Sequence, residues 1–246
     1  SVLFDVLHPT RRNLLKSQEL LDGIESGGRL MRVTHITGSE ETLETKSFVI
    51  SKSASHADRM PHDVIAKGVK ARAPFLVEEG GEMYLVEPAS SRGTLYLLGA
   101  GHVAYFTARI GLMTGFRTIV IDDREEFANT ERYPEADEVR AIENFDDCFG
   151  GDTLTGDAFV VIVTRGHKED KNVLAQALRT EAGYIGMIGS VKKREATYRL
   201  LRKEGFTDDD FARVRCPIGL KIGADTPEEI AVSITAELIA ARAGKL

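Results

Sequence analysis

The chain has 246 residues, of which 42% are hydrophobic and 28% charged, and its formal net charge is −6. These values are typical of a globular protein with one large domain or two modest ones. The negative charge disfavours a broad nucleic-acid-binding surface, and the apolar runs are far shorter than the roughly 20 residues that span a bilayer. We therefore expect neither a nucleic-acid nor a membrane partner.

The cysteine and histidine content predicts no metal site and no disulfide framework. Cys148 and Cys216 are the two cysteines and lie far apart, and the six histidines are dispersed. A buried thiol is the expected role of Cys216. Because the sequence also opens without a secretory pattern, we expect a cytoplasmic protein.

Residues 1–92 predict a small α+β domain without a motif of its own, and Pro88–Gly93 has the composition of a linker. β-branched and apolar segments predict strands here, and Glu-Glu-Gly-Gly-Glu predicts a hairpin turn. In chain order, the predicted elements are a helix over 13–21 that ends at Gly23, strands over 33–37 and 47–51, and hairpin strands over 75–77 and 83–86.

Residues 93–246 change to a regular alternation of apolar strands and amphipathic helices. This alternation predicts an α/β fold, with a Rossmann-like doubly wound parallel sheet that is covered on both faces. The predicted strands are 94–98, 118–121, 138–141, 158–163, 184–188 and 218–221, and the clearest helices are 102–114, 169–179, 191–204 and 227–243.

The first strand of this domain leads into Gly99-Ala-Gly-His-Val-Ala104, which fits the pattern G-x-G-x-x-A. In that pattern Gly99 makes a tight turn and Gly101 lets a phosphate approach the backbone. The free N–H groups and positive end of the following helix attract an anion. The alternative is that these glycines serve only to bring strand and helix together.

An acidic pair follows about 20 residues later, where Asp122 and Asp123 end the second strand. NAD-binding enzymes place an acid there to accept a hydrogen bond from a ribose hydroxyl, and Asp122 is the better-placed candidate. His102 is unusual, because dinucleotide loops do not require an imidazole. It is either a hydrogen-bond donor or weak ligand at the site, or a surface histidine bonded to a backbone carbonyl.

A second strand-to-helix loop contains Gly186, Gly189 and Ser190, and Ser190 is a plausible N-cap. The helix then begins with three cations, which repel the positive end of the helix dipole. A bound anion explains this arrangement, and a solvated basic face is the alternative. The three cations are Lys192, Lys193 and Arg194.

A third loop, Val163–Lys168, adds Arg165 and His167 to the same expected edge of the sheet. By the switch-point rule, the three loops converge over one crevice. Thr226, Pro227 and Glu229 predict a capping box at the start of the last helix. We find no Ser-His-Asp set, no lysine nucleophile and no acid for hydride transfer, so the crevice is expected to bind an anionic ligand rather than transform it.

These motifs together resemble the XdhC/CoxI family of accessory factors for xanthine dehydrogenase and related molybdenum hydroxylases. The resemblance runs from about residue 83 to the C-terminal end. It lies in the motifs Gly99–Ala104, Val120–Phe127, Thr164–His167, Tyr184–Ser190 and Pro217–Ala231.

The resemblance implies a chaperone that binds the molybdenum cofactor, molybdopterin, and supports its sulfuration with a cysteine desulfurase. It also implies insertion of the cofactor into an apo-hydroxylase client. The basic loop at 192–194 would then hold the cofactor's terminal phosphate, and His102 would belong to the cofactor site. The N-terminal half of the family usually carries a cysteine, whereas residues 1–92 contain none.

Two other functions remain open from the residues alone. One is an NAD(P)-dependent oxidoreductase that uses Gly99, Gly101 and Asp122 in their usual roles, and the other is a nucleotide-sensing or interaction domain. A homodimer is possible, because Rossmann-like accessory proteins often dimerise, but no hydrophobic seam in the sequence identifies an interface.

Overall fold

The computed structural model describes residues 9–25, 29–39, 42–51, 60–71, 74–90 and 93–246. The chain divides into two compact units, residues 1–91 and 92–246, and each is described by itself. Within the described ranges, no helix combines the length and the apolar character that a bilayer crossing requires.

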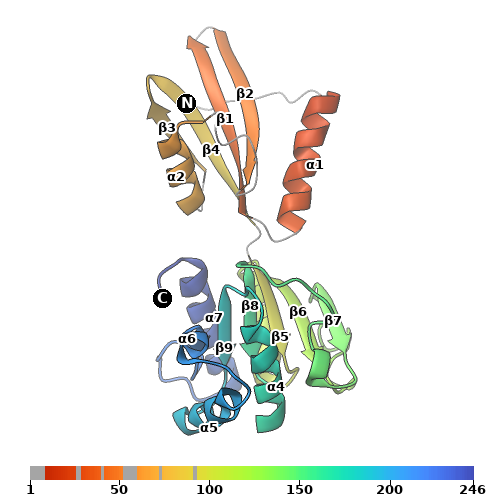
Figure 1. Ribbon diagram of the computed structural model, residues 1–246. Coiled ribbons are helices and arrows are strands. Elements are labelled where there is room, and N and C mark those ends of the chain that lie inside the picture. Colours follow the sequence, from red (N-terminus) through yellow and green to blue (C-terminus); the bar gives the residue numbers. More distant parts are fainter. Residues whose placement is uncertain (1–8, 26–28, 40–41, 52–59, 72–73, 91–92) are drawn as a thin grey trace. The chain divides into compact units, whose positions relative to one another are not determined.

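The N-terminal unit contains a four-stranded antiparallel sheet in the order β2-β1-β4-β3 (Figure 1). Its core includes Val33, Val64 and Val86, all with no exposed surface. Gly80 and Gly81 have φ of +62° and +80° and make the predicted hairpin turn. The elements are α1 (Arg11–Glu25), β1 (Arg29–Ser39), β2 (Thr42–Ser51), α2 (His62–Lys70), β3 (Phe75–Glu79) and β4 (Glu82–Ser90).

Three features of this unit differ from the sequence-based expectation. Gly23 does not end the first helix, because α1 continues to Glu25. This glycine lies against the side chain of Leu30, where a Cβ would overlap the leucine. The helix α2 was not predicted, and β4 extends to Ser90 into the expected linker.

The C-terminal unit confirms the predicted Rossmann-like fold. Its six strands form a parallel sheet in the order β10-β9-β8-β5-β6-β7. The elements are β5 (Thr94–Leu98), α3 (His102–Met113), β6 (Arg117–Asp122), β7 (Glu138–Ala141), η2 (Phe145–Asp147), β8 (Ala158–Ile162), α4 (His167–Leu178), β9 (Tyr184–Met187), α5 (Val191–Arg202), α6 (Asp208–Ala212), β10 (Val214–Arg215) and α7 (Pro227–Arg242).

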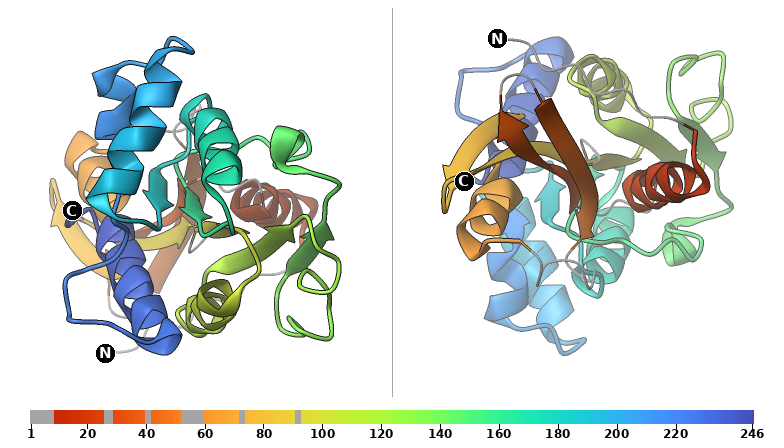
Figure 2. Two further views of the ribbon diagram at one scale, coloured as in Figure 1. Left: turned by 90° about the horizontal axis from the view of Figure 1, so that it is seen from below. Right: turned by 90° about the horizontal axis from the view of Figure 1, so that it is seen from above.

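Helices cover both faces of this sheet. Figure 2 shows α3 and α7 on one side and α4 and α5 on the other. The two apolar cores lie accordingly, one around Leu97 and Ile234 and one around Ile162 and Leu174. Strand β8 is buried at every position, as expected for a strand between two helical layers.

The strand order places a topological switch point between β5 and β8. The chain runs outward through β5, β6 and β7, then returns to the centre and runs outward through β8, β9 and β10. The loops that follow β5 and β8 are therefore neighbours at the carboxyl edge of the sheet, where ligands of open α/β folds bind.

Two local expectations in this unit need correction. The predicted strand over 218–221 is absent, because Gly219 takes φ of +101° and lies against Ser233 of α7, so the chain leaves the sheet. The sixth strand is β10 instead. Helix α4 begins at His167 rather than Glu169, with Gly166 as its N-cap. The predicted capping box of Thr226 and Glu229 at α7 is confirmed.

Candidate functional site

The loop after β5 is built by close approach of two chain segments. Gly99 has φ of +113°, and a Cβ there would overlap the carbonyl group of Val163. Its N–H donates to the Ile121 carbonyl at 2.7 Å. Gly99 therefore fixes the loop between the ends of β6 and β8, which accounts for a glycine at this position without a ligand.

Gly101 has the opposite surroundings. It is the N-cap of α3 with φ of −72°, and a Cβ built on it would meet no atom within 4 Å. No side chain caps α3, and its first turn contains no acidic residue. The N–H groups of this turn and the positive end of the helix are thus available to an anion.

The side chain of Asp122 is turned to the protein interior. It is 2% exposed, and its Oδ2 accepts a hydrogen bond from the Ala100 N–H at 2.6 Å. Arg124 donates from Nε to Oδ1 at 2.8 Å, from Nη2 to Oδ2 at 2.9 Å and from its backbone N–H to Oδ1 at 3.0 Å. Burial raises the pKa of Asp122, but these bonds outweigh it and hold the pKa below its ordinary value of 3.8.

These contacts correct the expected role of Asp122. Its carboxylate holds the glycine loop and Arg124, and no exposed face is left for a ribose hydroxyl. Asp123 is the acid that reaches the surface, with 31% of its side chain exposed and 3.8 Å between its Oδ1 and Arg124 Nε. Burial, and next the neighbouring Asp122 carboxylate, raises the pKa of Asp123.

Tyr133, which no sequence motif indicates, also holds this loop. It is buried and donates from its hydroxyl to the Ala100 carbonyl at 3.0 Å. Burial raises the pKa of Tyr133 to about 12, so the hydroxyl keeps its proton. Both polar groups of the Ala100 backbone are thus bound inside the protein. Only a long-range contact joins Tyr133 to the loop, so sequence spacing gave no signal for it.

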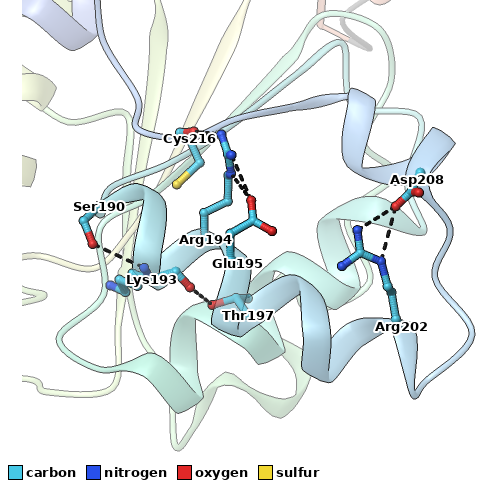
Figure 3. Close-up of polar contacts among 8 residues, drawn as sticks. All are labelled: Ser190, Lys193, Arg194, Glu195, Thr197, Arg202, Asp208 and Cys216. Carbon is cyan, nitrogen blue, oxygen red and sulfur yellow. Dashed lines mark hydrogen bonds and ion pairs between the residues drawn. The ribbon is translucent and has the colours of Figure 1, made fainter.

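The basic loop at the start of α5 differs from the expectation (Figure 3). Ser190 caps the helix by accepting from the Lys193 N–H at 3.2 Å. Lys193 extends its ammonium to the fully buried carboxylate of Asp170. Asp170 also accepts from the Thr164 hydroxyl at 2.5 Å, and this pairing joins α4, α5 and the loop after β8.

Arg194 is also bound within the protein. It donates from Nη1 to the Cys216 carbonyl at 3.0 Å and from Nη2 to Glu195 at 2.8 Å (Figure 3). Of the three cations that were expected to hold a phosphate together, only Lys192 is exposed and has no partner within the described part of the chain. Lys193 and Arg194 thus already have partners inside the protein, which disfavours the expected three-cation anion site.

The two glycines of the same loop have packing roles. Gly186 is buried inside β9, where a Cβ would overlap Ile218. Gly189 has φ of +150° and makes room for the Lys193 side chain. These contacts account for both glycines by packing within the protein.

The loop after β8 gives α4 a glycine N-cap, but the helix supplies its own anions. Glu169 and Asp170 lie in its first turn, and Glu169 Oε2 comes close to Gly166. Arg165 and Lys168 are exposed, and His102 is exposed in the first turn of α3 without a partner among the described residues. The side chain of His167 lies outside the described part of the structure.

The cysteines and potential metal ligands indicate no reactive centre. Cys148 and Cys216 are both buried, and burial raises the pKa of Cys148 to about 12 and that of Cys216 to about 11. Buried thiols with a raised pKa are inert as nucleophiles. Across the described ranges, His, Cys, Asp and Glu form no cluster of three that is arranged to hold a metal ion.

The α3 N-terminus is open and lies at the switch point of a doubly wound sheet. A comparison with known protein families gives a match to the same kind of fold. Residues 95–238 match the family described as the XdhC Rossmann domain. The chain belongs to this family. The match covers the six-stranded sheet from the second residue of β5 onward, and it includes the loops at residues 99, 164 and 189.

Two curated relatives match the chain over part of their own length. A protein of Escherichia coli (strain K12), named Uncharacterized protein YqeB, is 32% identical over 161 residues, which are 65% of this chain and 29% of the relative. A protein of Bacillus subtilis (strain 168), described as a probable xanthine dehydrogenase subunit, is 33% identical over 153 residues, which are 60% of this chain and 42% of the relative. The matches thus span less than half of either relative.

A solved structure resembles nearly the whole chain. The crystal structure described as a xanthine dehydrogenase from Bacillus halodurans has a TM-score of 0.69 and 25% sequence identity to it. The similarity covers 96% of this chain and 66% of that one, and so includes the N-terminal unit.

Proposed function

We propose that this XdhC-family protein is an accessory factor of a xanthine dehydrogenase or a related molybdenum hydroxylase. In this role it binds the molybdenum cofactor in the cytoplasm, assists its sulfuration and delivers it to the hydroxylase client. Membership of the family and the names of two similar proteins support the association with xanthine dehydrogenase.

One observation carries the proposed binding of the cofactor. The N-terminus of α3 has a glycine cap, no acid in its first turn and open space above Gly101. Molybdopterin ends in a phosphate, and a helix end with free N–H groups binds phosphate without any cationic side chain. The proposal therefore moves the phosphate from α5, where Lys193 and Arg194 are already bound, to α3.

Exposed cations near this edge provide a second, weaker attraction. Arg165, Lys168 and Lys192 are exposed on the loop after β8 and on the first turns of α4 and α5. Charges of this kind raise the rate of association with an anionic ligand and act over about 8–10 Å at moderate salt. His102 is proposed as a hydrogen-bond donor beside the phosphate.

The proposal assigns sulfur transfer to a partner. Both cysteines of the chain are buried and keep their protons, so neither suits a sulfur-carrying role. A cysteine desulfurase would supply the sulfur while this chain holds the cofactor. The cofactor supplies the redox-active metal to the client, whereas this chain binds and orients it. A homodimer remains a proposal.

An NAD(P)-dependent oxidoreductase is the second candidate. The strand order and the buried Ala104 of G-x-G-x-x-A favour it, because they match the fold that binds dinucleotides. The buried Asp122 argues against it, because this acid is bound to Ala100 and Arg124. A dinucleotide would have to use Asp123 for its ribose.

Calorimetric titration of the full chain with molybdopterin, NAD(H) and NADP(H) separates the two functions. We expect molybdopterin to bind more tightly than either dinucleotide. Binding should weaken with salt and with Ala at Arg165, Lys168 and Lys192, whereas Arg199→Ala on the last turns of α5 is the control. Tight dinucleotide binding without molybdopterin binding would replace this proposal with the oxidoreductase.

A further inference from the structure

Three arginines and two aromatic rings alternate beside the glycine loop. The Arg124 guanidinium carbon lies 3.9 Å from the centre of the Phe127 ring, and that of Arg132 lies 5.2 Å from the same ring. Arg132 is also 5.4 Å from the Tyr105 ring, which Arg109 approaches to 5.8 Å. This Arg–aromatic ladder joins the segment after β6 to the first turns of α3.

Arg124 is the most firmly held member of the ladder. Its Nε and Nη2 donate to the two oxygens of Asp122, which fixes the guanidinium in the plane of the carboxylate. Phe127 covers one face of that plane. The side chain nevertheless remains 18% exposed, and the face opposite Phe127 is the one on which a further ring could stack.

The position of Arg124 is tied to the open end of α3. Asp122 Oδ2 accepts simultaneously from Arg124 Nη2 and from the N–H of Ala100, the residue before Gly101. One carboxylate oxygen therefore separates the guanidinium from the loop that precedes the open helix. A ligand whose phosphate lies on α3 would bring its next few atoms to this guanidinium.

We propose that Arg124 is a stacking platform for a fused heteroaromatic ring of the ligand whose phosphate binds at α3. This inference rests on the proposed function, because it places the ring by way of the phosphate. A planar guanidinium stacks on aromatic faces, whereas an ammonium does not. Asp122 neutralises the charge, and the platform therefore selects for a flat ring rather than for a second anion. Purines and pterins both belong to this ligand class.

The experiment compares three probes that share a diphosphate group. Inorganic pyrophosphate has no ring, GDP has a purine and hydroxymethylpterin diphosphate has a pterin. Their affinities for the full chain are measured by calorimetry, and tyrosine fluorescence gives a second readout because the chain has no tryptophan. We expect at least one ring-bearing probe to bind about tenfold more tightly than pyrophosphate.

Arg124→Lys is the test variant, because lysine keeps the charge beside Asp122 and loses the plane. The ring advantage is the affinity of a ring-bearing probe divided by that of pyrophosphate. We expect Arg124→Lys to reduce this advantage from about tenfold to less than about threefold and to leave pyrophosphate binding unchanged. Arg140→Lys is the matched control. Arg140 lies on the edge strand β7, is similarly exposed at 23%, and is bound to Glu138 and Asp152. This variant should keep the full advantage.

Phe127→Leu tests the platform without touching the Arg124–Asp122 bonds and serves if Arg124→Lys does not fold. It removes the ring beneath the guanidinium and should reduce the advantage by about threefold. A preference for the pterin probe over GDP supports the cofactor as ligand, and the reverse preference supports a purine nucleotide as ligand of the same platform.

Two results would overturn the inference, and both differ from failure of the proposed function. A ring advantage that survives in both variants, or ring-bearing probes that bind no better than pyrophosphate to the wild type, would remove Arg124 from the site. A third result separates the two proposals. If pyrophosphate does not bind, but the ring-bearing probes bind and lose affinity in Arg124→Lys, Arg124 is still the stacking platform and the phosphate site at α3 is wrong.

Discussion

Helices α3 and α5 both begin at the carboxyl edge of the same sheet, and the first N–H groups of each helix lack partners within the helix. The two helix ends differ in how these groups are satisfied. Helix α5 begins with a serine cap and three cations. The cap, Lys193 and Arg194 are bound within the protein, whereas Lys192 is exposed. Helix α3 begins with a glycine, has no charged residue in the motif Gly99–Ala104 apart from His102 when protonated, and is left open. The loop with the most cations, at the start of α5, is thus the one in which most polar groups already have partners inside the protein.

The difference teaches that charge in a loop sequence does not by itself indicate a binding site. Lys193 is required by the buried Asp170, and a buried carboxylate without a partner is strongly unfavourable. The first N–H groups of α3 have no side-chain cap and no neighbouring acid in the helix. An anion site is therefore better indicated by what a helix end lacks than by the cations that follow it.

The largest expected effect contrasts the glycines of the two loops. Gly99→Ala puts a methyl group against the backbone of Val163 at φ of +113°, and we expect a loss of about 4 kcal/mol in unfolding free energy or failure to fold. Gly189→Ala meets only the flexible Lys193 side chain and should lose less. Urea unfolding followed by circular dichroism measures both, and equal losses would contradict the difference between the loops.

Neighbouring lysines of α5 give the next effect. Lys193→Met leaves the buried Asp170 without its ammonium partner, so we expect a loss of about 3 kcal/mol. Lys192→Met changes an exposed side chain and should alter stability by less than about 0.5 kcal/mol. The same unfolding experiment tests both. A stable Lys193→Met protein with weakened pyrophosphate binding would return Lys193 to the anion site.

A smaller effect on stability depends on pH. Because its pKa is depressed in the folded state, Asp122 contributes stability that is fully present above its unfolded value of about 3.8 and is lost as the pH falls through the folded value. We expect Asp122→Asn to be less stable than the wild type by about 2 kcal/mol at pH 7 and pH 5. The gap should shrink at pH 3. A gap that widens on acidification would contradict the contacts of Asp122.

Much of the fold followed from local patterns. The sequence predicted strands β5 and β7 and the helix starts at His102, Val191 and Pro227 at their observed positions. These features depend on apolar runs and caps that lie close together in the sequence. The helix α2 was missed because it is short and follows a segment without a clear cap. The strand at 218–221 was wrong because the positive φ of Gly219 depends on contact with α7.

The site was harder to predict than the fold. Gly101 was placed correctly by its pattern as the start of α3, because the motif is local. The long-range partners of Asp122, Lys193 and Arg194 were not, because the bonds to Ala100, Asp170 and Cys216 join segments that only the tertiary structure brings together. Lys193 meets Asp170 23 residues away, and Arg194 meets Cys216 22 residues away, as the residue numbers show. Spacing along the chain contains no signal for such pairs.

The most direct test of the account places a carboxylate on the open helix end. Gly101→Asp supplies α3 with a favourable cap, so thermal stability should stay equal or rise slightly, while pyrophosphate affinity measured by calorimetry should fall at least about tenfold. Ser190→Ala is the counterpart on α5 and should cost about 1 kcal/mol of stability without changing affinity. Unchanged pyrophosphate binding in a folded Gly101→Asp protein would contradict the assignment of the anion site to α3.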